Sequence, residues 1–417
     1  MKTIKKEILF GLLLIFPVGC GTGTLGGHTD AGEVIMQDGD AAGDLAQDAA
    51  DAATDAGSDA GSDAGIDAGI DAGIDAGDDI DHNEPTFACL ETAAEIQIVS
   101  GHHEDQVDPD TAPNKAFDAR QADFLIHQVR WGMIQVQGSG GDTGMCWAGG
   151  YLQSNKPWDA TWNDHKDLDG PTRNSSAINN RSTDMVVTGV HYFNVHDGDR
   201  TSDAINWLVQ HNWGDYVRDD CLENDHLHSG RVFDTLFDGC YTGISTRPSS
   251  SDSDSDGRGE LVQLDGVLLR IQAMPYPYKW ETKPGILDEN GDPYSGSGIP
   301  YGHGNLFKMT DESRNPEFSI TNSVFLGVHL TTEEKFDFPP ESLMRACENN
   351  TIIWLGPGDY PGQLPTGKFP DCFTILTGQA GRDFWREKVT DWHARHPGVG
   401  AHRKPSQPGS IEFPEVF

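Results

Sequence analysis

The stretch from residue 182 to 248 constrains the fold more than any other part of this 417-residue chain. Short pieces with alternating apolar residues recur there and beyond it, and Asp, Asn or Gly closes each piece. The apolar pairs are Val187/Val190, Tyr216/Val217, Val232/Leu236, Leu264/Val267 and Ile320/Val324. No piece keeps the i, i+3, i+4, i+7 spacing of a helix. Repeated short strands with turn residues between them predict an all-β chain, and repetition of one unit predicts a solenoid.

The N-terminus has the features of an exported lipoprotein. Lysines within the first six residues precede an apolar run that ends in Val18-Gly19-Cys20. This ending resembles the lipobox of bacterial lipoproteins, which implies cleavage before Cys20 and a lipid on its sulfur. The apolar run is too short for a transmembrane helix. We therefore expect a signal peptide over 1–19 and an outer-membrane lipoprotein, on either face of that membrane, held by its lipid alone.

The next segment, 20–84, is acidic and of low complexity. Between His28 and Glu84 there are seventeen Asp or Glu and no Lys or Arg, and Asp-Ala-Gly repeats fill its end. Such a segment repels itself and has almost no large apolar group to bury, so we expect a disordered linker. Such a linker has a reach of roughly 40–45 Å, which would keep a folded domain comprising residues 85–417 away from a membrane.

The charge balance restricts the partners of the folded domain. The whole chain has a formal net charge of −37, and it stays acidic when the linker is left out. Binding of nucleic acid needs Lys and Arg to neutralise phosphates, so we expect no nucleic-acid partner. A polyanionic substrate would need a bound cation to screen the repulsion.

Apart from Cys20, the sequence has six cysteines, an even number that predicts disulfides in an exported chain. These are Cys89, Cys146, Cys221, Cys240, Cys347 and Cys372. Pattern alone selects no pairing, but closeness along the chain favours Cys221 with Cys240 and Cys347 with Cys372.

One helix is predicted, near the C-terminus. Phe384, Trp385, Val389 and Trp392 recur at helical spacing, and Pro397 stops the helix. We expect it to pack as a cap on the end or the side of the sheet.

Four segments resemble coils of the right-handed parallel β-helix of the pectin-lyase-like superfamily, which includes pectate lyases and polygalacturonases. They are YVRDDCLEN, RVFDTLFDGC, LVQLDGVLLRIQ and FSITNSVFLGV, within about 180–360. A narrower resemblance, in DDCLEND and GHGNLFK, is to bacterial β-helix lipoproteins of no known activity. The resemblance implies strands stacked coil upon coil around an apolar interior. We therefore predict an all-β right-handed parallel β-helix with a C-terminal capping helix, preceded by the disordered linker.

The densest polar cluster lies between residues 197 and 228. If adjacent coils stack about 4.8 Å apart, acids on successive coils face one another and either share a proton or hold a cation. The members are Asp197, Asp199, Arg218, Asp219, Asp220, Glu223, Asp225, His226 and His228.

Two short motifs give this cluster a catalytic interpretation. Asp219-Asp220-Cys221 resembles the paired-acid motif of polygalacturonases, and Gly302-His303-Gly304 resembles their Gly-His-Gly. The resemblance implies hydrolysis by two acids, with His303 beside them. The departures are a gap of about 80 residues between the motifs and LRIQ where the family has Arg-Ile-Lys. The residues assigned to substrate binding are Arg218, Glu223, His228 and Arg270.

A calcium-assisted lyase is the other chemistry that the cluster predicts. Calcium on acids such as Asp197 and Asp199 would neutralise a uronate carboxylate and acidify its α-proton. Arg247 or Arg270 would then abstract that proton, as an arginine does in pectate lyases, although an arginine base needs strong local tuning.

A separate calcium loop is suggested by SSSDSDSDGRGE. Asp252, Asp254, Asp256 and Gly257 resemble the DxDxDG loop, in which alternating acids converge on the ion. Gln263 stands where the loop needs its bidentate Glu, so a solvated Ser/Asp loop is the alternative.

The sequence thus predicts a surface lipoprotein that cleaves or binds an extracellular polysaccharide in a cleft of the β-helix. The alternative is a non-catalytic adhesion or structural protein, in which the acids only cap turns.

Overall fold

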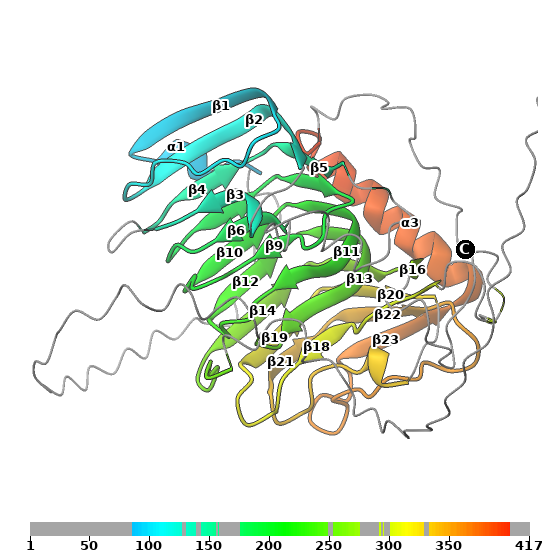
Figure 1. Cartoon of the computed structure of the whole chain (residues 1–417). Coiled ribbons are helices and arrows are strands. Elements are labelled where there is room, and N and C mark those ends of the chain that lie inside the picture. The colour runs from blue at the N-terminus through cyan, green and yellow to red at the C-terminus, as the bar shows by residue number, and fades with distance from the viewer. Residues whose placement is uncertain are drawn as a thin grey trace, which may run out of the picture. The chain divides into compact units, whose positions relative to one another are not determined.

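A computed structural model describes residues 86–126, 131–138, 143–155, 157, 176–248, 253–275, 292, 295, 301–328 and 333–400. The predicted signal peptide, the predicted linker over 20–84, Cys20 and Asp252 lie outside the described residues. Parallel strands wrap into a nearly closed sheet of 21 strands, and a helix follows the last of them (Figure 1). The predicted all-β parallel β-helix with a C-terminal helix is confirmed.

The sheet consists of three columns of stacked parallel strands, and the chain visits the columns in turn. The first column is β1 (Glu95–His103), β2 (Lys115–Ile126), β4 (Cys146–Ala148), β7 (Val186–Thr188), β10 (Trp207–Gln210), β12 (Gly230–Phe233), β14 (Leu261–Asp265), β19 (Glu317–Thr321) and β21 (Met344–Glu348). The second column continues β1 and β2 and adds β5 (Tyr151–Ser154), β8 (His191–Phe193), β11 (Trp213–Glu223), β13 (Leu236–Thr246), β15 (Leu268–Ile271), β20 (Val324–Gly327), β22 (Asn350–Trp354) and β23 (Phe373–Thr377).

The third column is shorter and carries the candidate site. Its strands are β3 (Gly132–Val136), β6 (Ser176–Asn180), β9 (Asp199–Arg200), the second halves of β11 and β13, and β18 (Phe307–Met309). Outside the columns lie a short antiparallel pair, β16 (Met274–Pro275) and β17 (Tyr301–Gly302), the helix α1 (Cys89–Thr92) and the 3-10 helix η1 (Glu333–Phe336).

Each turn from the first column to the second contains at least one residue with a positive φ. Glycine, asparagine, aspartate and histidine are the residues that adopt this left-handed conformation most readily. We call this set the turn column: Gly149, Gly189, His211, Asp234, Gly266, Asn322 and Asn349. The turn residues that close the apolar pieces in the sequence therefore have a common backbone role.

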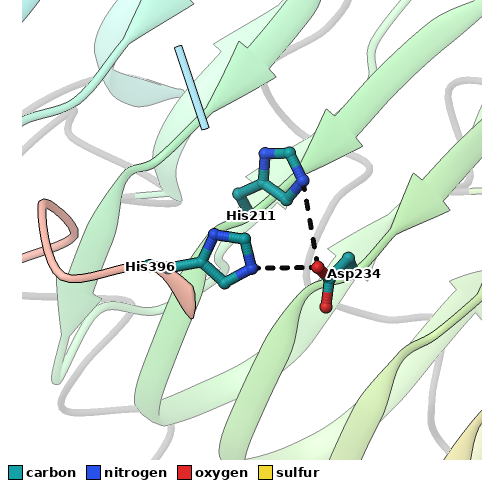
Figure 2. A group of neighbouring side chains, drawn as sticks. All are labelled: His211, Asp234 and His396. Carbon is teal, nitrogen blue, oxygen red and sulfur yellow. Dashed lines mark hydrogen bonds and ion pairs between the residues drawn. The ribbon is translucent and has the colours of Figure 1, made fainter. Parts of the chain in front are cut away.

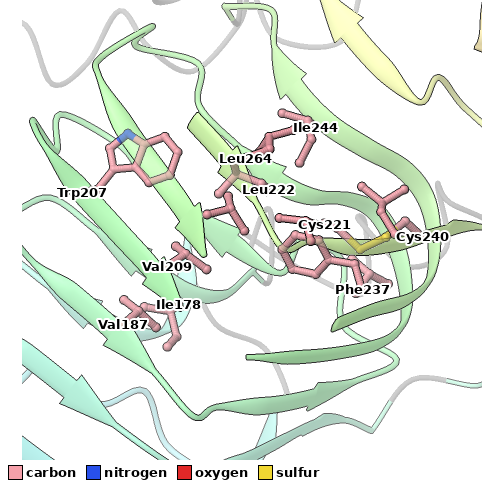
Figure 3. Packing of buried hydrophobic residues seen from close by; sticks show 14 of the residues in the cluster. Ile178, Val187, Trp207, Val209, Cys221, Leu222, Phe237, Cys240, Ile244 and Leu264 are labelled. Atoms are coloured by element: carbon pink, nitrogen blue, oxygen red, sulfur yellow. A yellow bond between two sulfur atoms is a disulfide. The ribbon is translucent and has the colours of Figure 1, made fainter. Parts of the chain in front are cut away.

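The interior of the coils is apolar (Figure 3). All three columns contribute inward side chains, among them Val187, Val209 and Leu264 from the first, Phe237 from the second, and Ile178, Leu222 and Ile244 from the third. Burial of each such side chain stabilises the fold by about 1.5–3 kcal/mol.

Three disulfides tie the described chain. The predicted pairs Cys221–Cys240 and Cys347–Cys372 are confirmed, and the third pair is Cys89–Cys146. Cys221 and Cys240 lie in the apolar interior of the coils, where their disulfide joins two adjacent coils (Figure 3).

The helix α3 (Gly378–Arg395) lies along the side of the second column, where Figure 1 shows it beside β22 and β20. Its Trp385 and Trp392 pack on outward side chains of successive strands, including Leu236, Val324 and Ile353. The predicted helical segment is confirmed, and the helix covers a side rather than an end. No helix in the described ranges combines the length and hydropathy that a membrane span requires.

Candidate functional site

The outer side of the third column carries a row of polar side chains in register. Each follows an inward residue on its strand, because successive side chains of a strand point to opposite sides. Strand pairing places them one above another in the order Gln135, Asn179, Arg200, Glu223, Ser245 and Lys308. Asn179 donates to Gln135 (2.8 Å), and Arg200 Nε lies 3.5 Å from Glu223 Oε2.

Asp219 and Asp220 join this row at the corner where β11 enters the third column. The register of β11 shifts between Val217 and Asp220, so strict alternation fails there and both acids reach one cluster. His196 Nε2 lies 3.6 Å from Asp219 Oδ2, and the Asp220 backbone N–H donates to Asp197 Oδ1 (3.4 Å). We call His196, Asp197, Asp219, Asp220, Glu223 and Lys308 the acid cluster.

Lys308 is the principal cation at Asp220. Its Nζ lies 2.9 and 3.3 Å from the two carboxylate oxygens of Asp220, whose side chain is 2% exposed. Burial raises the pKa of Asp220 to about 6, although the charge of Lys308 acts to lower it. Burial also disfavours the charged form of Lys308, but the nearby carboxylates outweigh it and raise the lysine pKa above its usual range. Asp220 can therefore hold or release a proton near neutral pH.

The neighbouring acids are also poised to hold protons. Burial raises the pKa of Asp197 well above its usual range, and the charges of Glu223 and Asp219 add to the effect. The pKa of Asp225 is raised by burial and then by Glu223. Like charges this close share protons or accept a cation. His196, Asp197 and Asp219 each offer one ligand atom, all within 4.8 Å of one another.

Asp199, predicted beside Asp197 as a metal ligand, lies elsewhere. Its Oδ2 accepts hydrogen bonds from the Tyr192 hydroxyl (3.0 Å) and from Asn212 Nδ2 (3.1 Å). Burial raises the pKa of Asp199 to about 7. Its partner Leu222 points inward, so Asp199 belongs to the interior side of β9 rather than to the acid cluster.

Three predicted residues lie near the cluster with differing surroundings. Arg218 is buried, donates to the Tyr216 hydroxyl (2.8 Å) and covers its ring. Arg247 is exposed just after β13, and its positive charge acts to lower the pKa of Lys308. His228 is half-buried, its ring faces that of His226, and desolvation lowers its pKa.

The remaining candidates, His303 and Arg270, contact groups outside the acid cluster. His303 is buried with its ring edge against Phe336, and its Nδ1 lies 2.8 Å from the Gly304 carbonyl oxygen. Arg270 donates to Asp238 Oδ1 (2.5 Å) on the outer side of the second column. The Gly-His-Gly segment runs beside β13, where the Gly304 N–H donates to the Tyr241 carbonyl (2.7 Å), next to Thr242, the strand partner of Asp220.

The predicted calcium loop is described from Ser253 onward. Arg258 binds both carboxylate oxygens of Asp256 (2.9 Å from Nε), and Arg314 donates to the Ser253 and Ser255 carbonyls. Asp254 is exposed. Arg258 thus occupies the Asp256 carboxylate, one of the groups that a calcium ion would use.

Sequence reasoning missed Lys308, Arg200 and His196. Lys308 reaches Asp220 only because β18 pairs with β13, and 60 residues separate the two strands. No local pattern in the sequence singles out Lys308.

Comparison of the chain with protein-family models, with curated proteins and with solved structures found no match.

Proposed function

We propose that the acid cluster binds an extracellular polysaccharide and that Asp219 and Asp220 cleave it by acid–base hydrolysis. The observation that carries the proposal is the meeting of two adjacent acids on one outer side, one of them with a pKa raised to about 6. An acid with such a pKa can be protonated before the reaction and ionised after it, as a general acid must be.

The chemistry divides between the two carboxyl groups. Asp220 gives its proton to the glycosidic oxygen as the bond from that oxygen to the anomeric carbon breaks. Asp219, whose side chain is 14% exposed, takes a proton from the water that attacks the same carbon. The products are two shorter glycans, and Lys308 holds the ionised Asp220.

Cation-assisted binding of an acidic glycan belongs to the same proposal. The carboxylates of Asp197 and Asp219, which lie in one group with His196, would hold the ion, and the ion would neutralise a uronate carboxylate. Calcium is the expected ion for the carboxylates. If a chelator changes neither the melting temperature nor the glycan affinity, the cation is excluded from the proposal, and the hydrolysis by Asp219 and Asp220 is unaffected.

The experiment compares wild type with Asp219→Asn, Asp220→Asn and the control Asp238→Asn, an acid of the second column. Neutral and uronate-containing glycans are screened for new reducing ends and for the ultraviolet absorbance of an unsaturated uronate. We expect Asp220→Asn to lose about 10²–10⁴-fold in rate with little change in glycan affinity, since it removes a general acid. The control should keep wild-type turnover.

A non-catalytic binding protein is the second candidate. The pairs Lys308–Asp220 and Arg200–Glu223 favour it, because an acid that serves an ion pair is less available for proton transfer. Glycan binding without turnover on the whole panel would select this candidate.

Attachment to the outer membrane by a lipid on Cys20 completes the proposal. Incorporation of labelled fatty acid into wild type, and its loss in Cys20→Ala, tests the anchor. A labelled Cys20→Ala chain would show that the lipid is elsewhere.

A further inference from the structure

A second buried polar group lies in the turn column, away from the acid cluster. His211, Asp234 and His396 offer three ligand atoms within 4.8 Å of one another (Figure 2). Their exposed fractions are 0, 1 and 2%. His211 and Asp234 are turn-column residues of adjacent coils, and His396 follows the last residue of α3. The group thus joins the solenoid to the C-terminal segment.

Within the described part of the chain, neither ring nitrogen of His211 makes a hydrogen bond of good geometry, and the Thr86 backbone is the nearest partner. The Asp234 carboxylate oxygen Oδ2 is 4.0 Å from Nε2, beyond hydrogen-bond distance. A buried polar group without such a bond costs free energy, so the position favours a ligand that supplies the missing interaction.

His396 is oriented as a metal-binding histidine commonly is. Its Nδ1 lies 2.8 Å from the Thr86 hydroxyl, and its Nε2 lies 2.9 Å from Asp234 Oδ2. In metal sites, one ring nitrogen binds the ion while an oxygen holds the other nitrogen and fixes the ring. In this protein the hydroxyl oxygen of Thr86 holds Nδ1 of His396 in the same way.

Arg395 is the cation now in contact with this carboxylate. Its guanidinium binds Asp234 Oδ2, and Nη1 lies 3.3 Å from His396 Nε2. The Arg395 side chain is 31% exposed, and its Nε also donates to Asp391 (3.2 Å). Arg395 therefore keeps a partner at the surface if another cation displaces it from Asp234.

We propose that His211, Asp234 and His396 bind one divalent transition-metal ion, zinc by preference, which displaces the Arg395 guanidinium from Asp234. Two imidazoles and one carboxylate are the donors that zinc accepts, whereas calcium and magnesium take oxygen ligands. A hollow of about 520 Å³ is lined by Thr86, which contacts His396, and by Pro397 and Gly398, which follow His396 in the chain.

The ion would fasten three parts of the chain together. Thr86 stands at the start of the described domain, His211 and Asp234 belong to the solenoid, and His396 ends the segment that covers the second column. Binding that occurs only in the folded state stabilises that state, so the ion should raise the melting temperature. The inference is independent of the acid cluster.

The test uses the purified full chain after dialysis against a chelator. Zinc is titrated by calorimetry, and cobalt is added as a coloured substitute whose visible bands report nitrogen and oxygen ligands. We expect one equivalent of zinc, a higher melting temperature with zinc than with chelator, and weaker binding of calcium. Thr86→Val should weaken zinc binding by about 10–100-fold, as loss of an orienting hydrogen bond does.

Three further variants decide the assignment. His211→Asn should lose more zinc affinity than Thr86→Val, and Arg395→Met should gain affinity because the competing guanidinium is gone. His191→Asn is the matched control, since His191 is equally buried but stacks on Trp213 (centroids 3.7 Å apart) and should leave one equivalent bound. Absence of zinc and cobalt binding in wild type, equal binding by wild type and His211→Asn, or a preference for calcium would each overturn the proposal.

Discussion

The outward side chains of the second and third columns differ in chemistry, although both columns belong to the same coils. Outward residues of the second column are apolar where α3 covers them, as Leu236, Val324 and Ile353 are. Outward residues of the third column form the polar row that contains Arg200, Glu223 and Lys308. The inward residues of both columns are alike, because both line one apolar interior. The fold is therefore set by the inward residues, and the two outer surfaces are free to differ in chemistry.

The two surfaces also hold their central carboxylates differently. Asp234, beside the second column, has His396 and Arg395 as partners, and these hydrogen bonds outweigh burial and lower its pKa. Asp220, in the third column, has Lys308 as its principal cation, and its pKa is raised to about 6. The first arrangement stabilises a fixed charge and the second leaves a proton exchangeable. This difference favours the third column as the place for acid–base chemistry.

The largest expected effect is on the helix-covered surface, with Trp392→Ala. Trp392 is fully buried, and its Nε1 donates to the Asp234 carbonyl (2.9 Å). We expect a loss of about 3–5 kcal/mol in the free energy of unfolding, from the cavity and the lost burial. Urea denaturation followed by circular dichroism measures it. Arg386→Ala, on the exposed side of the same helix, should cost less than about 0.5 kcal/mol. Equal effects of the two variants would show that α3 does not pack on the second column.

The helix shows how much of the architecture could be predicted from the sequence. The helical spacing of its apolar residues predicted where the helix lies. The Asp, Asn and Gly residues that end the apolar pieces predicted the turns. The start of the solenoid is less visible: the segments that resemble coils begin at about residue 180, yet the coils begin with β1 at Glu95. Ile96 and Ile98 of β1 are 46 and 63% exposed, so the first coil does not show the inward alternation of the central ones.

The site was predicted in part, for a physical reason. Acids close in sequence, such as Asp219 and Asp220, were expected together because neighbouring coils stack. Lys308 and His396 reach their acids through strand pairing and helix packing over 88 and 162 residues, and no local pattern carries such information. Asp199 was misplaced because its side of the strand depends on the exact register.

A smaller effect is expected in the third column, with Lys308→Met. The change leaves Asp220 buried without its principal cation, which costs about 3 kcal/mol at pH 8. The deficit should shrink as the pH falls through about 6, because Asp220 then becomes protonated in the folded wild type as well. The double variant Lys308→Met/Asp220→Asn should recover much of the loss. Chemical denaturation at pH 5 and pH 8 measures the stability loss of Lys308→Met and its recovery in the double variant. A stability loss that does not change with pH would contradict the assigned ion pair.

A pH-dependent effect is expected on the interior side of the third column, with Asp199→Asn. The pKa of Asp199 is about 7 in the folded chain, against an ordinary value of 3.8. Between those values the folded chain keeps a proton that the unfolded chain releases, so the contribution of Asp199 to stability is present below pH 4 and lost as the pH rises through 7. Asp199→Asn removes this loss, and the stability of the variant relative to wild type should rise from pH 4 to pH 8. Asp256→Asn, at an exposed acid outside the columns, should run parallel to wild type over the same range. Parallel curves for Asp199→Asn and wild type would place Asp199 in a hydrated setting and remove the distinction between the inner and outer acids of the third column.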